Sequence, residues 1–288
     1  MNGKCCLITG GSDGIGLAAA RELAHMGASV VMVGRNEAKT AAAANRITQE
    51  TGNGSVRYMV ADLSSQADVR RLAAEVTESI PRLDVLVNNA GAAFLSRRRS
   101  VDGIEMTFAL NHLGYFLLTT LLLDLLGRSS PARIVNVASA AHSSAGSFRL
   151  EDLPSPEKCG GFRAYGRSKL CNILFTYELA RRLEGSGVTA NTLHPGLVRT
   201  NIARNNGLLG RMVNFFIGVR GVDAAKGAET VVYLAASPEV EGLTGKYFEN
   251  RRAVPSSALS YDAELASDLW KLSERLTQPS EGMGENRH

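Results

Sequence analysis

Short apolar runs alternate with longer amphipathic stretches along most of the chain. The short runs are rich in valine and isoleucine and have the length of buried strands; they cover Cys5–Ile8, Ser29–Val33, Val56–Val60, Val85–Val87, Arg133–Val137 and Val188–Leu193. Between them, apolar residues recur at helical spacing over Ile15–Met26, Glu37–Glu50, Ala67–Ser79, Asp102–Leu126 and Ala164–Leu183. Because parallel strands need helical crossovers, this alternation predicts an α/β fold with a doubly wound parallel sheet and helices on both faces.

The same pattern continues without a linker or an internal repeat that would divide the chain. We expect one domain over residues 1–277 and a disordered tail over residues 278–288, where proline, glycine and charged residues replace the apolar pattern. The most apolar segment, Leu113–Leu126, is about 14 residues long and contains Asp124. It is shorter than the roughly 20 residues that span a bilayer, so we predict a buried helix and no transmembrane segment.

The composition is that of an ordinary globular protein, with 44% hydrophobic and 21% charged residues among 288. A net charge of +4 says little about partners. The densest basic run, Arg97–Arg99, lies in a predicted loop, where a solvated surface accounts for it. No motif that reads nucleic acid accompanies it, so we expect no nucleic-acid partner.

The cysteines indicate a reducing environment. Cys5, Cys6, Cys159 and Cys171 show no CxxC pattern and no cysteine–histidine spacing typical of zinc, so no metal site is expected. The N-terminus has no charged region before a long apolar stretch, and we therefore expect no signal peptide. Reduced thiols together with this N-terminus predict a cytoplasmic protein.

A glycine-rich segment follows the first predicted strand and opens the first predicted helix. It reads Thr9-Gly10-Gly11-Ser12-Asp13-Gly14-Ile15-Gly16. Glycine adopts positive φ and lets backbone amides approach a pyrophosphate, while the helix N-terminus adds partial positive charge. The segment favours a dinucleotide site, and a plain strand-to-helix turn is the alternative.

The end of the second predicted strand indicates which dinucleotide is bound. NAD sites place Asp or Glu about 20 residues after the glycines to hold the ribose hydroxyl, but this chain has Gly34-Arg35-Asn36. The planar guanidinium of Arg35 suits a phosphate, so NADP (NADPH) is the predicted cofactor. Asp13 places an unfavourable negative charge in the loop, and an exposed helix-start residue is the alternative for Arg35.

Tyr165 and Lys169 stand four residues apart at the start of a predicted helix. That spacing brings two side chains to within about 5–6 Å of each other. A lysine cation at this distance is expected to lower the pKa of a phenol from about 10 to about 8. Such a phenol suits protonation of a carbonyl oxygen or deprotonation of an alcohol. By itself, the spacing is more often that of a surface pair.

Several motifs resemble, in their order, the short-chain dehydrogenase/reductase family over about Lys4 to Leu276. They are Gly10, Gly14 and Gly16, Asn88-Asn89-Ala90-Gly91, Asn111, Ser139, Tyr165 and Lys169. The chain is most similar to the retinol-dehydrogenase-like branch, in the stretches "LNHLGYFLLT" (Leu110–Thr119), "YGRSKLCNILFTYELARRL" (Tyr165–Leu183), "HPGLVRT" (His194–Thr200) and "GKYF" (Gly245–Phe248). The last of these marks a further strand, and the resemblance implies a Rossmann fold.

One interval differs from the simplest family pattern and favours the same branch. Ser139 precedes Tyr165 by 26 residues, and the insert His142–Phe162 resembles a loop that retinol-dehydrogenase-like enzymes carry there. Ser143 and Ser144 lie close by and are alternatives for the active-site serine. Ser139 ends a predicted strand, which is where active-site residues of such sheets lie.

The resemblance also implies a role for each matching residue. Tyr165 would be the general acid/base, and Lys169 would lower its pKa and hold the nicotinamide ribose. Ser139 would bond the reacting oxygen, and Asn111 would position a water that relays protons; a turn residue and a helix-bending residue are the alternatives. The implied cofactor-binding residues are Gly10, Ser12, Asp13, Gly14, Ile15, Gly16, Arg35, Asn36, Asp62, Leu63, Asn88, Ala90, Gly91, Tyr165, Lys169, Pro195, Gly196, Val198 and Thr200. For His142 and His194, which lack a metal partner at suitable spacing, we expect structural roles.

The activity that the resemblance implies is NADP-dependent interconversion of a lipophilic alcohol and its aldehyde or ketone. Apolar residues after Thr200, between Leu208 and Ile217, would form a flap over such a substrate or an amphipathic helix packed on the body. An NADPH-dependent C=C reductase of the protochlorophyllide-reductase type and a non-catalytic NADP-binding regulator are the alternatives. A regulator has no need for the tyrosine.

The predicted helices Leu113–Leu126 and Leu170–Leu183 are too apolar to leave one face in water. In the family the corresponding helices pair with their copies across a twofold axis, and Leu117, Leu121 and Leu125 would supply part of that patch at helical spacing. A homodimer or homotetramer is therefore expected.

Overall fold

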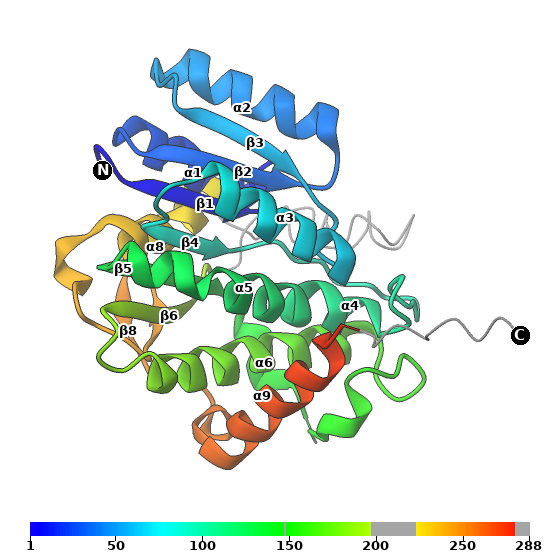
Figure 1. Ribbon diagram of the computed structural model, residues 1–288. Coiled ribbons are helices and arrows are strands. Elements are labelled where there is room, and N and C mark those ends of the chain that lie inside the picture. Colours follow the sequence, from blue (N-terminus) through cyan, green and yellow to red (C-terminus); the bar gives the residue numbers. More distant parts are fainter. Residues whose placement is uncertain (147, 197–222, 280–288) are drawn as a thin grey trace, which may run out of the picture.

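The computed structural model describes residues 1–146, 148–196 and 223–279, in which eight strands form one sheet (Figure 1). The strands are β1 (Cys5–Thr9), β2 (Ser29–Gly34), β3 (Val56–Val60), β4 (Val85–Asn88), β5 (Ala132–Val137), β6 (Val188–His194), β7 (Tyr247–Glu249) and β8 (Arg252–Ala253). Their order is β3-β2-β1-β4-β5-β6-β7-β8, and each neighbouring pair is parallel except β7 and β8. The predicted parallel sheet is confirmed. The apolar pattern did not predict β8, because both of its residues are exposed.

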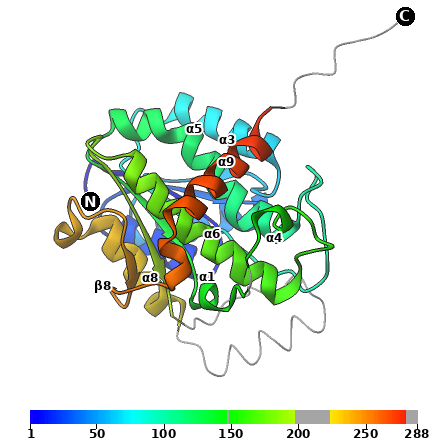
Figure 2. The same ribbon diagram turned by 90° about the horizontal axis from the view of Figure 1, so that it is seen from below.

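Helices cover both faces of the sheet (Figure 2). One core packs beneath α1 (Gly14–His25), α2 (Glu37–Thr51) and α8 (Ala224–Ala236), and the other beneath α3 (Gln66–Ser79), α5 (Gly114–Arg128) and α6 (Gly161–Arg182). The predicted α/β architecture is therefore confirmed, and α8 is a helix that the sequence analysis did not predict.

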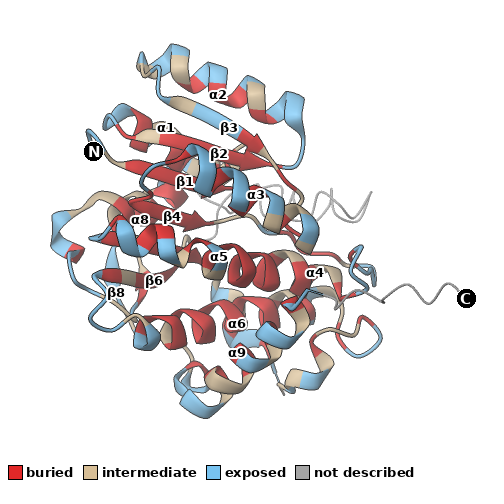
Figure 3. Cartoon of the chain, in the orientation of Figure 1, coloured by how far each residue is buried: buried red, intermediate tan, exposed pale blue. Residues whose placement is uncertain are grey.

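The helix predicted over Asp102–Leu126 begins later and contains an irregular turn. α4 (Met106–Phe108) continues into a π-helical turn (Ala109–Leu113), which leads directly into α5. By length and composition the combined helix of 23 residues could cross a membrane, but 72% of its most apolar part is buried in the protein, as Figure 3 shows for α5. It is the buried helix that the sequence predicted, although it begins at Met106 and ends at Arg128.

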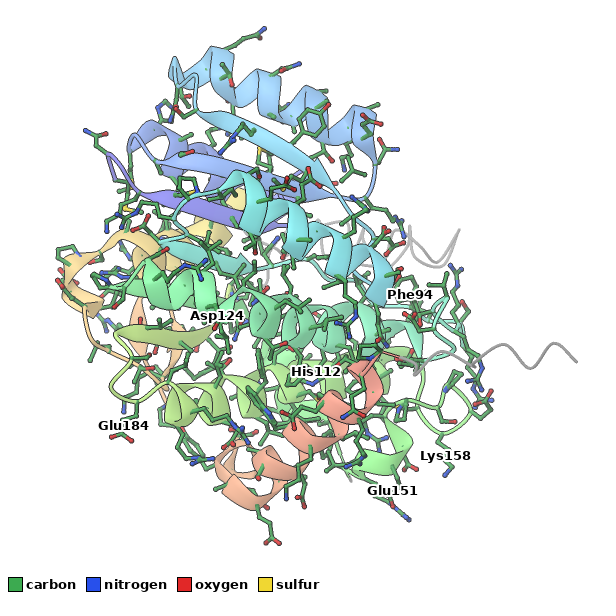
Figure 4. All side chains as sticks on the ribbon, in the orientation of Figure 1. Phe94, His112, Asp124, Glu151, Lys158 and Glu184 are labelled. Atoms are coloured by element: carbon green, nitrogen blue, oxygen red, sulfur yellow. The ribbon has the colours of Figure 1, made fainter. Side chains whose placement is uncertain are left out.

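A further unpredicted helix, α9 (Ala263–Thr277), lies across α6. The Trp270 ring packs edge-on against Phe116 of α5, with the ring centroids 5.0 Å apart. Nearby, His112 Nε2 and Ser273 Oγ form a hydrogen bond of 2.9 Å, which places His112 beside α9 (Figure 4). The C-terminal helix thus covers apolar surface that α5 and α6 would otherwise expose.

The leucines that the sequence offered for a twofold interface lie mostly in the protein's own core. Leu117 and Leu125 are 4% and 2% exposed and pack with residues of α3 and the sheet, whereas Leu121 is 38% exposed. The prediction that all three leucines supply part of a self-complementary patch is wrong for Leu117 and Leu125, because these two are buried within the chain, whereas Leu121 is exposed. A homodimer or homotetramer remains a prediction that requires another surface.

The strand order reverses between β1 and β4. Chain segments leave these two strands in opposite directions along the sheet, so a crevice opens at their carboxyl ends, where doubly wound folds bind ligands. The glycine-rich segment follows β1 and the Asn88–Gly91 segment follows β4. Both predicted motifs therefore meet at this crevice.

Candidate active site

The loops after β1 and β4 are hydrogen-bonded to each other. Thr9 Oγ1 accepts hydrogen bonds from the backbone N–H groups of Asn89 and Ala90, at 2.8 and 3.1 Å. In return, Asn89 Nδ2 donates to the carbonyl oxygen of Thr9 at 2.9 Å. The sequence analysis predicted Ala90 as a cofactor-binding residue but gave no role to Thr9 or Asn89. The available signal for these two was that Thr9 adjoins Gly10 and Asn89 adjoins Asn88.

Two glycines of the loop are required by the close approach of backbone to backbone. Gly10 has a φ of +66°, and a β-carbon there would lie 2.9 Å from the Cα atom of Ala90. A β-carbon at Gly16 would lie 2.4 Å from the carbonyl oxygen of Gly10 and 2.5 Å from Asn89 Nδ2. Neither position has room for a side chain.

The first turn of α1 points its N–H groups into the crevice end of the sheet. Asp13 caps the helix, with its carboxylate accepting from Gly14 N–H at 2.8 Å. The N–H groups of Ile15 and Gly16 have no acceptor within the helix, because the first turn never does, and such N–H groups suit an anion. Lys39 Nζ lies 2.5 Å from the Asp13 carboxylate and offsets the charge that the sequence analysis regarded as unfavourable.

Charged and polar groups gather at the carboxyl end of β2. The Arg35 side chain is 64% exposed, and its Nη1 lies 3.7 Å from Asp62 Oδ2. Ser12 Oγ is also close, since a β-carbon built on Gly34 would lie 3.1 Å from it. Asn36 accepts a hydrogen bond from the first turn of α2 at 2.9 Å, so its side chain caps that helix. Arg35, Asp62 and Ser12 therefore lie at the same end of β2, and their binding of a cofactor stays a prediction.

The four predicted catalytic residues meet beyond the ends of β4 and β5. Ser139 follows β5, and Tyr165 and Lys169 lie one turn apart on α6. Lys169 Nζ is 5.8 Å from the centre of the Tyr165 ring, and the Ser139 side chain hydrogen-bonds to Tyr165. Ser139 and Tyr165 are partly exposed, whereas Lys169 and Asn111 are 3% and 0% exposed. The serine and the tyrosine therefore face outward in front of the lysine and the asparagine.

Asn111 lies in the π-helical turn and holds the loop after β4. Its Oδ1 accepts from Ala92 N–H at 2.9 Å, and its Nδ2 donates to the Ala92 carbonyl and to Ser168 Oγ, both at 3.0 Å. A β-carbon at Gly91 would lie 3.2 Å from Asn111 Oδ1 and 3.4 Å from Lys169 Nζ. Gly91 thus brings the loop close to both residues, and Ser168 is a contact that the sequence analysis missed.

His142 has the structural role that was expected. Its Nε2 accepts a hydrogen bond of 3.1 Å from Ser257 N–H, so Nδ1 carries the ring proton and donates to the carbonyl oxygen of Ser139 at 2.7 Å. Burial lowers the pKa of His142, in agreement with a neutral ring. The imidazole therefore positions the backbone of the active-site serine, and the exposed Ser143 and Ser144 do not contribute to that arrangement.

The remaining predicted residues are less uniformly placed. Asn88 is 0% exposed, and its Nδ2 donates to Thr119 Oγ1 of α5 at 2.9 Å and to Asn136 Oδ1 of β5 at 2.8 Å. Its side chain therefore ties three elements together, and a position beside the cofactor stays a prediction. Leu63 is also buried, and Pro195 and Gly196 follow β6 at the carboxyl edge. Val198, Thr200 and the apolar segment of residues 208–217 lie outside the described residues.

Burial shifts the pKa values of Tyr165 and Lys169 in opposite directions. It raises the pKa of Tyr165 to about 12, while the hydrogen bond from Ser139 acts in the opposite sense. It lowers the pKa of Lys169 to about 7, and Lys169 Nζ donates to the Val137 carbonyl at 2.8 Å. The prediction that the lysine lowers the phenol's pKa towards 8 is wrong for the chain by itself, because burial disfavours both charged forms.

The lowered pKa of Lys169 makes the stability of the fold depend on pH. The folded chain releases this proton near pH 7, but the unfolded chain holds it up to about pH 10.5, the ordinary value. Because the unfolded state binds more of this proton in that window, the contribution of Lys169 to stability should rise with pH from about 7, by up to about 1.4 kcal/mol per unit. Urea unfolding at a series of pH values measures this, and Lys169→Met should remove the rise. An identical pH dependence in that variant would show that the lysine is not buried as described.

The contact at Gly16 predicts opposite effects for two helical glycines. Gly16→Ala places a methyl group against the Gly10 carbonyl and should lower the free energy of unfolding by about 1–3 kcal/mol. A β-carbon at Gly127, on α5, meets nothing within 4 Å, so Gly127→Ala should raise it by about 0.5–1 kcal/mol. Equal effects of the two substitutions, measured by urea unfolding, would contradict the close approach.

Comparison with known proteins adds to this geometry. The model of the family described as short chain dehydrogenase matches residues 4–208. Retinol dehydrogenase 14 of Mus musculus is 43% identical to the chain, over 95% of this chain and 86% of the relative. Polyprenol dehydrogenase of Homo sapiens is 38% identical, over 95% of this chain and 85% of the relative.

Solved structures show the same fold. An uncharacterized protein from Mycobacterium paratuberculosis superposes with a TM-score of 0.78 at 36% identity, covering 96% of this chain and 94% of that one. The RhlG/NADP active-site complex of Pseudomonas aeruginosa superposes with a TM-score of 0.69 at 31% identity, covering 86% and 94%. The chain belongs to the short-chain dehydrogenase/reductase family, in its retinol-dehydrogenase-like branch.

Proposed function

We propose that this protein uses NADP to interconvert a lipophilic alcohol and its aldehyde or ketone, with Tyr165 as the general acid/base. The observation that carries the proposal is the meeting of Ser139, Tyr165, Lys169 and Asn111 beside the glycine loop, at the carboxyl edge of the sheet. The names of the relatives support the substrate class, since retinol and polyprenol are both lipophilic alcohols. The four buried, free thiols support a cytoplasmic location as part of the proposal.

The crevice residues fit a dinucleotide phosphate. The N–H groups of Ile15 and Gly16 are available to a pyrophosphate at the N-terminus of α1. The exposed guanidinium of Arg35 is suited to a ribose phosphate, and no acidic residue stands at positions 34–36. A solved relative is an NADP complex, which supports the same choice. When bound, the nicotinamide supplies or accepts the hydride.

The protein's own groups would handle the oxygen and the proton. The Ser139 side chain hydrogen-bonds to Tyr165, so the two hydroxyls lie close enough together for both to donate hydrogen bonds to one carbonyl oxygen. A raised pKa keeps Tyr165 protonated near neutral pH, which is the state that a general acid needs for carbonyl reduction. The buried Lys169 lies behind it, where it can supply a replacement proton, and Asn111 would position a water that relays this proton.

Tyr165→Phe tests the catalytic assignment. The substitution keeps the ring but removes the proton donor, so turnover should fall by about 10² or more while NADPH still binds. NADPH oxidation with lipophilic aldehydes and ketones measures turnover, and NADPH fluorescence measures binding. Tyr177→Phe, on the same helix, is the matched control. Near-normal turnover of Tyr165→Phe would exclude this tyrosine as the general acid.

The same substrate series separates the proposed function from its alternatives. Oxidation of NADPH with enones but not with aldehydes or ketones would indicate C=C reduction. NADPH binding without turnover on any of these substrates would indicate a regulator. Turnover on a saturated aldehyde or ketone is the expected result.

Arg35→Asp tests the cofactor preference. The substitution replaces a phosphate-pairing cation with a carboxylate that repels the phosphate and can accept from the ribose hydroxyl. The affinity for NADPH relative to NADH should drop at least about tenfold, as measured by fluorescence titration. Arg57→Asp makes the same charge change at an exposed position on β3 and should leave the ratio unchanged. An unaltered ratio in Arg35→Asp would contradict the role of Arg35.

A further inference from the structure

Lys169 is a buried amine with few groups to stabilise its charge. The residue is 3% exposed, and its Nζ donates to the Val137 carbonyl. No carboxylate of residues 1–146, 148–196 or 223–279 forms a salt bridge with it. Burial lowers its pKa to about 7. Any group that favours the ammonium form therefore changes the fraction of Lys169 that is protonated at neutral pH.

Two aromatic rings lie close to this amine. Lys169 Nζ is 5.6 Å from the centre of the Tyr115 ring and 5.8 Å from that of Tyr165, both within the range of a cation–π contact. Tyr115 is on α5, one helical turn after Asn111, and is 0% exposed. A cation–π contact gains strength where water is excluded, as it is here.

The hydroxyl of Tyr115 does not explain why this residue is buried beside the lysine. It has no hydrogen-bond partner in the described part of the chain, although buried hydroxyls usually have one. Burial raises the pKa of Tyr115 well above its ordinary value, with a smaller contribution from Tyr165, so both phenols facing Lys169 are neutral near pH 7. From β5 the lysine meets the Val137 carbonyl and from the loop after β4 it meets Gly91, and neither carries a charge.

We propose that Tyr115 is a positioning residue whose ring face holds the Lys169 ammonium in the protonated state. The mechanistic value of that state rests on the proposed function, whereas the contact and the charge can be tested without it. By the usual strength of a cation–π contact, removal of the ring should lower the pKa of Lys169 by about 0.5–1.5 units. Tyr115 thereby offsets part of the effect of burial.

Unfolding at a series of pH values provides a test that needs no substrate. The part of the pH-dependent rise in stability that belongs to Lys169 is obtained by subtracting the Lys169→Met variant in each background. With Tyr115→Leu, the rise should begin about 0.5–1.5 pH units lower than in the parent chain. With Tyr115→Phe, which keeps the ring and removes only the unpartnered hydroxyl, it should begin where it does in the parent.

A fluorinated ring separates charge from packing, in case the leucine variant does not fold. Pentafluorophenylalanine at position 115 keeps the shape of phenylalanine but reverses the polarity of the ring face, so it should shift the rise as leucine does. Phe116→Leu truncates the neighbouring buried ring, which packs against Trp270. This control should lower stability without moving the rise. If the rise in stability begins at the same pH with phenylalanine and with pentafluorophenylalanine at position 115, the proposal is overturned.

The pH profile of kcat/KM gives a second readout that a purely packing role would not move. If the protonated lysine supports the reaction, kcat/KM should fall on the alkaline side of its pH profile as Lys169 loses its proton. This fall should move to lower pH by about 0.5–1.5 units in the pentafluorophenylalanine variant but not in Tyr115→Phe. A fall that stays in place in the fluorinated variant would contradict the proposal. If the parent chain turns over none of the substrates, the proposed function fails, and the unfolding series still decides whether the ring holds the charge.

Discussion

The contact between the loops after β1 and β4 fixes the position of every other part of the site. A β-carbon at Gly10 or Gly16 would collide with Ala90, Asn89 or the loop's own carbonyl, so the two loops pack backbone to backbone. Thr9 and Asn89 join them by hydrogen bonds in both directions. Two residues beyond Asn89, Gly91 passes within contact distance of Asn111 and Lys169. The glycine-rich turn and the proposed catalytic group are thus linked through the loop after β4, so the spacing of β1 and β4 in the sheet sets the distance between them.

Burial governs the electrostatics of this site more strongly than the tyrosine–lysine pair does. In water the lysine would favour the phenolate, but in the protein both groups shift towards their neutral forms. The chain by itself therefore holds a proton donor in front of a weakly basic amine. Within the described part of the chain, the contacts that favour the ammonium are one carbonyl and the two tyrosine rings. Because these contacts are few, the proposed contact of the Tyr115 ring can affect the charge of Lys169 although the ring takes no part in the proposed reaction.

The C-terminal helix determines how much of the apolar surface remains for other proteins. Trp270 fills the space beside Phe116 and Phe175, so α9 supplies from within the chain a cover that a second subunit would otherwise provide. Leu117 and Leu125 of α5 also belong to the chain's own core, where they pack with residues of α3 and the sheet. Helix amphipathicity specifies that a face is buried, but it does not specify against what.

The sequence by itself determined the local structure and predicted which residues gather at the candidate site. Valine-rich runs and helical spacing predicted the first six strands and five of the helices to within a few residues. They did so because the buried face of a regular helix or strand requires apolar residues at the repeat of that element. The glycines, Arg35, Ser139, Tyr165 and Lys169 were predicted from motifs whose chemistry is local. Only the tertiary structure decided what lies around them. The inward position of Asn88, the pairing of Asp13 with Lys39 and the approach of Tyr115 to Lys169 join segments far apart in the chain or on different elements. The pKa shifts were missed for the same reason, since burial is a property of the packed whole and no single stretch of residues encodes it.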